Sequence, residues 1–292
     1  MEINGAYTAL ITPFNIYGDV DYKQLKENIA FQINNGIDGI LALGTTAETP
    51  TLTCEEKEEI LKICKETING RVSFMIGTGT NSTATTIENT KNAERIGADI
   101  ALIVTPYYNK PTQEGIYRHF ESIVKSTNIP ILVYNIKGRT GRNIETTTLE
   151  RIAKLERVIG VKEASGDLSQ IQEVISAIHL NNNNFNVMSG DDSLTLPLLS
   201  LGGNGVVSVI SNLYPKEVSS MVRNYLNDNI AEALKIHNKL LPIMKGAFIE
   251  TNPSPIKEAM KVRNMDSGIV RLPLVEMSNN NKELIKEIVE KL

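Results

Sequence analysis

The sequence predicts an α/β protein built as a (β/α)8 TIM barrel, with a helical extension at its C-terminal end. Two observations carry this prediction. Short apolar runs recur eight times between residues 7 and 210, and longer amphipathic segments separate them. A chain of 292 residues also accommodates one such barrel with residues to spare. An open, doubly wound sheet is the alternative, but no glycine-rich dinucleotide fingerprint follows the first run.

The apolar runs are nearly continuous in hydrophobicity, which is typical of parallel strands that are buried on both faces. In chain order they are Tyr7–Thr12, Gly39–Leu43, Val72–Gly77, Ile100–Thr105, Ile131–Asn135, Val158–Lys162, Asn186–Ser189 and Gly205–Ile210. After the last run, the segment from Pro215 to Leu292 shows the pattern of further helices. We therefore expect a catalytic barrel over residues 1–225 and a helical region over residues 226–292 that packs on it.

The segments between the runs carry helix start and stop signals. Two of them open with a capping-box pattern, formed by Asp21 with Gln24 and by Thr53 with Glu56. Glycines stand just past three segments, where a left-handed residue ends a helix. They are Gly36, Gly70 and Gly97.

Composition argues against several classes of protein. Thirty basic residues against 34 acidic ones give a net charge of −4, whereas nucleic acids and anionic membranes attract a basic face. No apolar stretch approaches the roughly 20 residues of a membrane-spanning helix. The first residues show neither the basic start nor the apolar core of a signal peptide, so we expect a cytoplasmic protein.

The cysteines and histidines predict no metal site. Cys54 and Cys64 form no CxxC pair, so we expect two reduced thiols. His119, His179 and His237 fall in helical segments without a second ligand at metal-binding spacing. We expect these histidines on solvated helix faces.

Polar residues at strand ends are the candidates for chemistry, because barrel enzymes place their sites at the carboxyl ends of the strands. The turn Gly44–Thr49 follows the second run and offers the hydroxyls of Thr45 and Thr46. With the backbone N–H groups of the turn, these hydroxyls can hold a carboxylate. Small and hydroxyl residues also form ordinary turns, and that interpretation stays open.

Lys162 is the most informative of these residues. It ends the apolar run Val158–Lys162, whereas most other lysines lie in alternating helical patterns that a solvated face explains. A desolvated lysine loses proton affinity and becomes a competent amine nucleophile. A Schiff-base lysine and a snorkelling structural lysine are both compatible with this position.

Two other strand ends carry polar residues. Tyr134 lies in the fifth run, where a phenol can relay protons, and Arg139 in the following loop can bind a carboxylate. A core tyrosine and a solvated arginine are the simpler alternatives. Asp191 and Asp192 follow the seventh run and suggest either metal ligands or a capped helix start, of which we favour the cap.

Several motifs occur in a recognisable order along the whole chain. They are Gly44-Thr45-Thr46-x-Glu48, Tyr107-Tyr108-Asn109-x-Pro111, Tyr134-Asn135, Arg139-Thr140-Gly141, Gly160-x-Lys162-Glu163-Ala164, Ser189-Gly190-Asp191-Asp192, Gly205–Val209, Asn252-Pro253-x-Pro255-x-Lys257 and Arg271-Leu272-Pro273. In this set the chain resembles the dihydrodipicolinate synthase family. The resemblance implies a (β/α)8 barrel that condenses pyruvate with L-aspartate 4-semialdehyde, in the pathway to diaminopimelate and lysine, without a metal or organic cofactor.

The resemblance also implies catalytic roles. It makes Lys162 the lysine that forms an imine with pyruvate, and Tyr134 the residue that shuttles protons. Thr45 would bridge Tyr134 to Tyr108, and Tyr108 would reach in from a neighbouring subunit. The family's assembly is at least a dimer and usually a tetramer.

Binding roles follow from the same resemblance. Thr46, with backbone N–H groups of its turn, would hold the carboxylate of pyruvate. Arg139 would bind the carboxylate of the semialdehyde. Gly190 and Val207 would supply backbone surface beside the imine.

The chain departs from the family pattern in two places. Ala47 stands where glycine is usual, and alanine tolerates a positive φ poorly. Lys137 and Gly138 stand where a proline is common, which predicts a looser loop around Arg139.

Related families share the lysine and the tyrosine, so N-acetylneuraminate lyases and keto-deoxy sugar acid aldolases are the alternative. The paired Thr45 and Thr46, together with the triplet that begins at Arg139, favour the synthase. A catalytically inactive barrel with a binding role is a further alternative. The joint presence of Lys162, Tyr134 and Thr45 argues against it.

Overall fold

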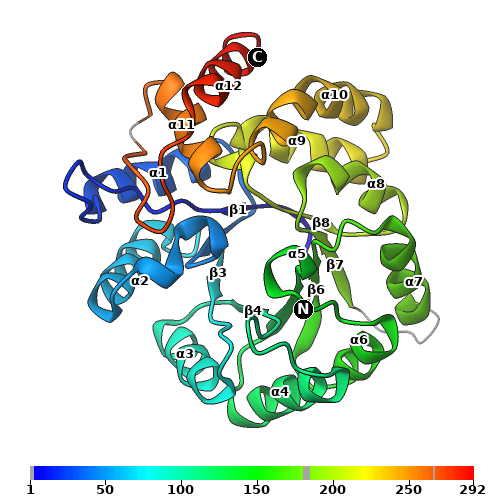
Figure 1. Ribbon diagram of the computed structural model, residues 1–292. Helices are drawn as coiled ribbons and strands as arrows, with labels where there is room; N and C mark the ends of the chain where they lie inside the picture. The colour runs from blue at the N-terminus through cyan, green and yellow to red at the C-terminus, as the bar shows by residue number, and fades with distance from the viewer. Residues whose placement is uncertain (1–2, 180–184, 266) are drawn as a thin grey trace. The chain divides into compact units, whose positions relative to one another are not determined.

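The computed structural model describes residues 3–179, 185–265 and 267–292. Its eight parallel strands follow one another around a closed barrel in the order β1 to β8 (Figure 1). The prediction of a (β/α)8 barrel is therefore confirmed. The doubly wound alternative is excluded, because an open sheet would leave two strands with an unpaired edge.

Each strand overlaps its predicted apolar run, although β1 begins and ends earlier in the chain than the run Tyr7–Thr12. The strands span Gly5–Ala9 (β1), Gly39–Ala42 (β2), Ser73–Gly77 (β3), Ile100–Val104 (β4), Ile131–Asn135 (β5), Val158–Glu163 (β6), Asn186–Ser189 (β7) and Gly205–Ser208 (β8). In the register of β5 and β6, Tyr134 pairs with Lys162. Paired residues of parallel strands point to the same face, so these two side chains lie side by side.

The helices of the described residues fill the intervals between the strands and continue after β8. They span Tyr22–Asn34 (α1), Cys54–Ile68 (α2), Thr83–Ile96 (α3), Gln113–Ser126 (α4), Lys137–Thr140 (α5), Thr146–Ala153 (α6), Leu168–His179 (α7), Thr195–Ser200 (α8), Pro215–Leu226 (α9), Ile230–Gly246 (α10), Ser254–Val262 (α11) and Asn279–Glu290 (α12). Short 3₁₀ turns occupy Thr45–Ala47, Thr49–Thr51, Asp192–Leu194 and Ile210–Asn212.

The chain packs as two compact units. The first consists of Met1–Asn4 with Met75–Val207, and the second of Gly5–Phe74 with Ser208–Leu292. In the first unit, α3, α4, α6 and α7 follow one another outside strands β4 to β7 (Figure 1). The second unit contains β1 and β2 with α1 and α2, together with helices α9 to α12.

Local capping explains several helix boundaries. Thr53 and Glu56 form the predicted capping box at the start of α2. Asp21 accepts the N–H of Gln24 at 2.9 Å, which is one half of the predicted box. Gly97 ends α3 in the left-handed conformation with φ 81°. The predicted glycines Gly36 and Gly70 also have positive φ, although the cap residues of their helices are the asparagines just before them.

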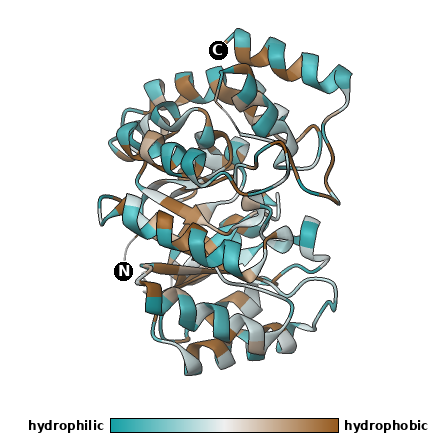
Figure 2. Ribbon diagram, turned by 90° about the vertical axis from the view of Figure 1, so that its left-hand side faces the viewer, coloured by the Kyte–Doolittle hydropathy of each residue, from teal (hydrophilic) through white to brown (hydrophobic). Residues whose placement is uncertain are grey.

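Apolar side chains fill the interior of both units. Figure 2 shows helices that carry hydrophobic residues along one side and hydrophilic residues along the other. Strand residues such as Ile103 and Val133 in the first unit, and Ile40 and Ala6 in the second, have no exposed surface. No helix among the described residues has the length and apolar character needed to cross a membrane.

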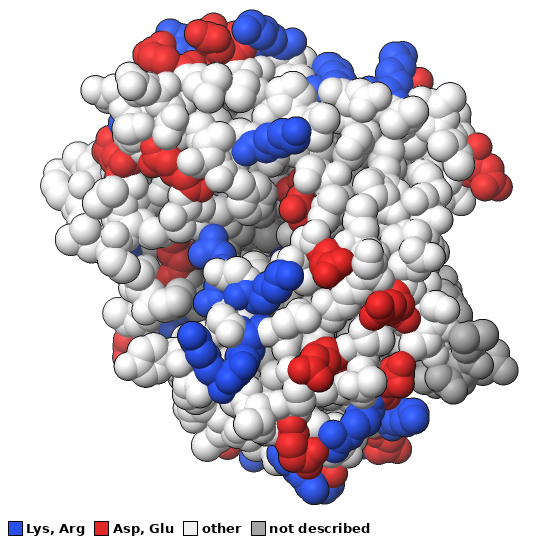
Figure 3. Space-filling model, turned by 45° about the vertical axis from the view of Figure 1, so that its right-hand side comes forward, with Lys and Arg blue, Asp and Glu red and all other residues white. Residues whose placement is uncertain are grey.

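Charged side chains of both signs share the surface. Figure 3 shows acidic and basic residues interspersed over one face, with a group of Lys and Arg side chains gathered at one place. Exposed ion pairs, such as Arg118 with Glu114 at 2.8 Å, add only about 0–1 kcal/mol each. The ion pairs that matter to the site are therefore the buried ones.

Two histidines do not lie where the sequence predicted them. His119 is 4% exposed and His237 is 8% exposed, so the expectation of solvated helix faces was wrong for both. Each lies on the side of its helix that faces the interior. Burial lowers the pKa of His119 to about 4 and lowers the pKa of His237 as well. The side chain of His179 lies outside the described part of the chain.

The two cysteines are free thiols, as predicted. Cys54 is exposed at the first residue of α2, whereas Cys64 is completely buried on the same helix. Burial raises the pKa of the Cys64 thiol to about 12, which keeps it protonated and unreactive at neutral pH.

Candidate active site around Lys162

Lys162 is buried near the carboxyl end of β6. The residue is 5% exposed, and its backbone pairs with Tyr134 of β5 and Met188 of β7. Its Nζ lies 4.3 Å from the centre of the Tyr134 ring. The amine therefore lies where the apolar run predicted it, against the face of an aromatic side chain that is itself 5% exposed.

Burial sets the charge state of Lys162. Loss of hydration lowers the pKa of its amine to about 7, with the charge of Asp192 opposing this shift and that of Arg139 adding to it. Asp192 is near enough for its charge to act on this amine, but Lys162 forms no ion pair within the described residues. The lowered pKa favours the neutral amine, and the neutral form is the one that attacks a carbonyl carbon.

Gly190 brings the backbone close to the amine. Its N–H donates to the carbonyl of Glu163 at 2.7 Å. A Cβ at this position would lie 3.0 Å from Cε of Lys162 and 2.8 Å from Cβ of Ala164, so a larger residue would displace the lysine. Val207, the other residue expected to supply backbone surface, is completely buried in β8.

Arg139 lies in α5, a single helical turn directly after β5. The N–H of Gly141 donates to the carbonyl of Lys137 at 2.9 Å, and Gly141 ends the turn with φ 69°. Lys137 and Gly138, which replace the expected proline, are part of this helical turn. The side chain of Arg139 is exposed, yet its charge contributes to the lowered pKa of Lys162.

A buried amide network fixes the loop that carries Arg139. Nδ2 of Asn135, the last residue of β5, donates to Glu163 Oε2 at 3.0 Å and to Asn143 Oδ1 at 2.9 Å. Glu163 is 1% exposed, and burial raises the pKa of its carboxyl. Because Glu163 follows Lys162 directly, the network ties the loop to the strand that presents the amine.

Thr45 and Thr46 belong to the second unit, where they form a 3₁₀ turn after β2. The N–H of Ala47 donates to the carbonyl of Gly44 at 3.2 Å, and the N–H of Glu48 donates to the carbonyl of Thr45 at 3.1 Å. Among the described residues, the N–H groups of Thr45 and Thr46 have no acceptor. Two adjacent free donors are an arrangement that suits an anion such as a carboxylate.

The alanine that replaces the family's glycine in this turn keeps an ordinary backbone conformation. The positive φ angles of the segment fall on Leu43 (52°) and Glu48 (53°), not on Ala47. Ala47 is also held in place, because the hydroxyl of Thr12 donates to its carbonyl at 2.8 Å. The substitution therefore leaves no strain at this residue.

A buried ion pair anchors the end of the turn. Nζ of Lys257 in α11 lies 2.7 Å from Oε1 of Glu48, and both side chains are no more than 2% exposed. The same ammonium donates to the carbonyl of Ile269 at 2.7 Å, and the N–H of Arg271 donates to Oε2 of Glu48 at 2.9 Å. These contacts hold Glu48 in its left-handed conformation, which otherwise costs about 1–2 kcal/mol for a residue with a side chain.

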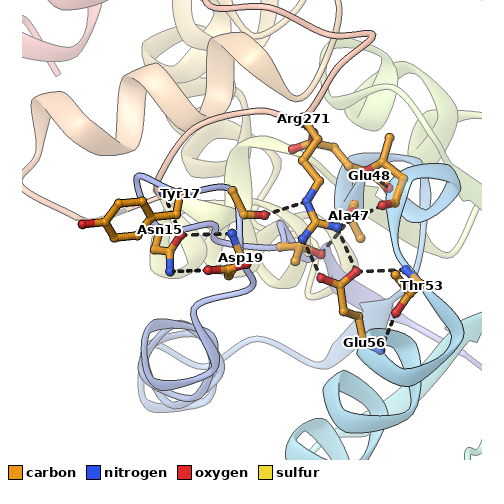
Figure 4. A network of polar contacts seen from close by, with 11 residues as sticks. Asn15, Tyr17, Asp19, Ala47, Glu48, Thr53, Glu56 and Arg271 are labelled. Atoms are coloured by element: carbon orange, nitrogen blue, oxygen red, sulfur yellow. Dashed lines mark hydrogen bonds and ion pairs between the residues drawn. The ribbon is translucent and has the colours of Figure 1, made fainter.

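Arg271 connects three segments of the second unit (Figure 4). Its Nε donates to the carbonyl of Gly18 at 2.8 Å, and its Nη1 donates to the carbonyl of Thr51 at 2.9 Å. The guanidinium also pairs with Glu56, whose carboxyl pKa it lowers. Because Glu56 is part of the capping box of α2, this contact fixes the start of that helix beside the turn.

Tyr108 lies at the surface of its unit. It is 89% exposed, and its φ of 72° is rare for a bulky side chain. The side chain of Asn109 donates to the carbonyl of Asn81 at 2.8 Å and so restrains this loop. The chain alone therefore does not bury the tyrosine that the sequence assigned to the site.

The aspartates after β7 have different roles. Asp191 accepts the N–H of Ser193 at 2.8 Å and caps the 3₁₀ turn Asp192–Leu194, so the favoured interpretation is confirmed for this residue. Asp192 is instead 2% exposed, and its charge raises the pKa of Lys162. Sequence reasoning missed this influence.

Sequence reasoning also assigned no function to Asn252 and Lys257. Both residues are buried, at 4% and 2% exposure. The sequence feature that could have drawn attention to them is the compact motif Asn252-Pro253-x-Pro255-x-Lys257. It places an amide and a cation next to two prolines, in a segment whose pattern does not indicate a solvated helix face.

A barrel that holds a desolvated lysine at the carboxyl end of β6, against a tyrosine ring, has the arrangement that a lyase acting through a Schiff base requires. The particular family follows from its motifs and from the comparison of the whole chain. The profile of the Dihydrodipicolinate synthetase family matches residues 2–292, and the chain belongs to this family.

Relatives match along the entire chain. The 4-hydroxy-tetrahydrodipicolinate synthase of Protochlamydia amoebophila (strain UWE25) is 51% identical over 292 residues, covering 100% of this chain and 97% of the relative. The crystal structure of the dihydrodipicolinate synthase from Thermotoga maritima superimposes with a TM-score of 0.97 at 40% identity, covering 100% of this chain and 99% of that one. The crystal structure of the dihydrodipicolinate synthase from Acinetobacter baumannii, complexed with pyruvate, gives a TM-score of 0.95 at 36% identity. The match covers 99% of this chain and 98% of that one.

Proposed function

We propose that this chain is a lyase that condenses pyruvate with L-aspartate 4-semialdehyde to give 4-hydroxy-tetrahydrodipicolinate. The single observation that carries the proposal is the buried amine of Lys162, whose pKa is lowered to about 7. The family and the names of the relatives supply the substrates and the place of the reaction in the pathway to diaminopimelate and lysine.

The proposed reaction runs through a covalent intermediate on Lys162. The neutral amine attacks the ketone carbon of pyruvate, and the resulting carbinolamine loses water to give an imine. Loss of a proton from the methyl carbon gives an enamine, and this carbon attacks the aldehyde carbon while the aldehyde oxygen takes up a proton. The amine of the semialdehyde then attacks the imine carbon, closes the ring and displaces Lys162.

Proton transfer is assigned to hydroxyl groups. Tyr134 is buried beside the amine, which supports its role in shuttling protons at the imine and the aldehyde oxygen. Thr45 would link Tyr134 to Tyr108. The imine itself serves as the electron sink, so the proposed mechanism uses no metal and no organic cofactor.

Two groups of residues would bind the substrate carboxylates. The free N–H groups and the buried hydroxyl of Thr46 support its assignment to the carboxylate of pyruvate. Arg139 would bind the carboxylate of the semialdehyde through its guanidinium. Gly190 and Val207 would present backbone beside the imine.

We further propose that the active form is at least a dimer, with a tetramer as the usual assembly of the family. The support from this chain is Tyr108, a large aromatic residue that is 89% exposed on a loop with a positive φ. In a dimer this side chain would enter the site of the neighbouring subunit. The division into a barrel over residues 1–225 and a helical region over 226–292, and the cytoplasmic location, stay predictions.

Borohydride trapping tests the proposed function. Reduction in the presence of pyruvate fixes the imine as a secondary amine, which adds one pyruvate-derived mass to the peptide that contains Lys162. Turnover is then compared with aspartate semialdehyde and, for the alternative lyase, with N-acetylneuraminate. Absence of the adduct, or turnover of N-acetylneuraminate alone, would refute the proposal.

A further inference from the structure

One amide from the C-terminal helical region reaches the hydroxyl of Thr46. Nδ2 of Asn252 donates to Oγ1 of Thr46 at 2.9 Å, across 206 residues of sequence. Asn252 is 4% exposed and Thr46 is 2% exposed, so water does not compete for this contact. Within the described residues, Thr46's hydroxyl makes no other hydrogen bond.

The direction of this bond decides what the hydroxyl can do. A threonine hydroxyl has one hydrogen to donate and two lone pairs that accept. Since Asn252 donates to one lone pair, the hydrogen of Thr46 must point away from the amide. The free N–H groups of Thr45 and Thr46 lie in the same turn, so the turn offers two backbone donors and one side-chain donor.

We propose that Asn252 is a positioning residue for the keto-acid substrate: it fixes the hydroxyl of Thr46 so that its hydrogen is donated to the carboxylate of pyruvate. The inference rests on the proposed function. A buried hydroxyl whose hydrogen lacks an acceptor is unfavourable, so the arrangement favours a ligand that brings an anionic acceptor.

An amide suits this task better than an ionised side chain. A carboxylate at position 252 would accept the hydrogen of Thr46 itself and turn the donor away from the substrate. A lysine ammonium at position 252 would attract the anionic substrate. Its three N–H donors rotate freely, so it would fix the orientation of the Thr46 hydroxyl less well than an amide does.

Other residues hold the rest of the turn. The carbonyl of Ala47 is held by Thr12, and the carboxylate of Glu48 is held by Lys257 and the backbone of Arg271. A change at Asn252 should therefore reorient one hydroxyl and leave the backbone of the turn in place.

The test compares Asn252→Asp and Asn252→Ala in steady-state kinetics with both substrates. Asn252→Asp has the same shape but replaces the donor with an acceptor, so KM for pyruvate should rise about 10- to 100-fold. Asn252→Ala leaves the hydroxyl free to rotate and should raise it about 3- to 10-fold. KM for the semialdehyde should change less than about twofold. If Thr46 were instead the donor, Asn252→Asp would preserve the bond and leave KM for pyruvate unchanged, which would overturn the proposal.

A double-mutant cycle separates positioning from general damage. In a Thr46→Val background no hydroxyl remains to be oriented, so adding Asn252→Ala should change KM for pyruvate by less than about twofold. Equal effects of Asn252→Ala with and without Thr46 would overturn the proposal. The matched control is Asn28→Asp, which makes the same chemical change at a buried residue. Within the described residues, the side chain of Asn28 accepts a hydrogen bond from Gln24 and makes no other, and the change should leave KM for pyruvate unchanged.

The outcomes also separate this inference from the proposed function. If the unmodified chain forms no borohydride-trapped adduct with pyruvate, the proposed function fails. If the adduct forms normally and the effects of Thr46→Val and Asn252→Ala on KM for pyruvate are additive, only the proposed role of Asn252 fails.

Discussion

Two buried lysines in this chain face an aromatic ring at the same distance but have different surroundings. Nζ of Lys162 lies 4.3 Å from the centre of the Tyr134 ring, and Nζ of Lys257 lies 4.3 Å from the centre of the Phe14 ring. Lys257 also has the carboxylate of Glu48 at 2.7 Å. Within the described residues, Lys162 has no such ion pair.

The difference shows that burial alone does not identify a reactive lysine. Burial lowers the pKa of both amines, to about 7 for Lys162 and to about 8 for Lys257, where the charge of Glu48 opposes the shift. The ammonium of Lys257 is also engaged by Glu48 and by the carbonyl of Ile269, so its donors are occupied. Lys257 is therefore a structural cation, whereas Lys162 is a buried amine with the properties that the proposed reaction requires.

The strongest way to break this comparison is to remove each amine in turn. Lys162→Ala should abolish the pyruvate adduct trapped by borohydride, because no second lysine of the described residues is buried without an ion pair. Mass spectrometry of the reduced protein measures this. An adduct of the same mass on Lys257 in the variant would show that the two lysines are chemically equivalent.

Removing the other amine should damage stability instead. Lys257→Met leaves the carboxylate of Glu48 buried without its cation, which costs about 3–5 kcal/mol in the free energy of unfolding. The double variant Glu48→Gln/Lys257→Met removes both charges and should lose less than the single variant. Denaturant unfolding decides this, and a Lys257→Met protein as stable as the unmodified chain would contradict the assigned role.

Arg139→Ala sharpens the comparison, because Arg139 influences only one of the two lysines. KM for the semialdehyde should rise roughly 10- to 1,000-fold through loss of a charge-assisted contact. The pKa of Lys162 should rise slightly, since one cation that lowers it is gone. Equal weakening of both substrates in steady-state kinetics would instead make Arg139 a structural residue.

The smallest expected effect is the pH dependence of the reactive amine. The fraction of neutral Lys162 falls about tenfold per pH unit below its pKa of about 7, so the rate of imine formation should fall with it. Because this pKa lies below the usual 10.5, the unfolded chain binds the proton of Lys162 more tightly than the folded chain does. The contribution of Lys162 to the free energy of unfolding therefore increases from pH 7 toward pH 10. Rapid-quench trapping across pH 5.5–8.5 measures the first effect. A flat profile would contradict the lowered pKa.

The fold could be predicted because its signal is local. Each strand appears as a short apolar run, and Lys162 could be singled out because it interrupts the end of such a run. The motif that contains Asn252 and Lys257 does not predict their partners, since Thr46 and Glu48 lie more than 200 residues away in the sequence. His119 was misplaced because a polar residue on the inner side of an amphipathic helix looks, in sequence, like one on the outer side.

The two thiols of α2 make it possible to measure how often this helix separates from the core. A thiol-reactive dye should modify exposed Cys54 of the isolated chain at once, whereas Cys64 reacts only when the helix leaves the core, because its thiol is fully buried. The rate at which a second equivalent of dye reacts thus measures the rate of helix opening at native pH without denaturant. Glu56 joins the same helix to Arg271, whose N–H also holds Glu48 at the end of the turn Thr45–Ala47. The labelling rate of Cys64 would therefore report how firmly the C-terminal region holds this turn.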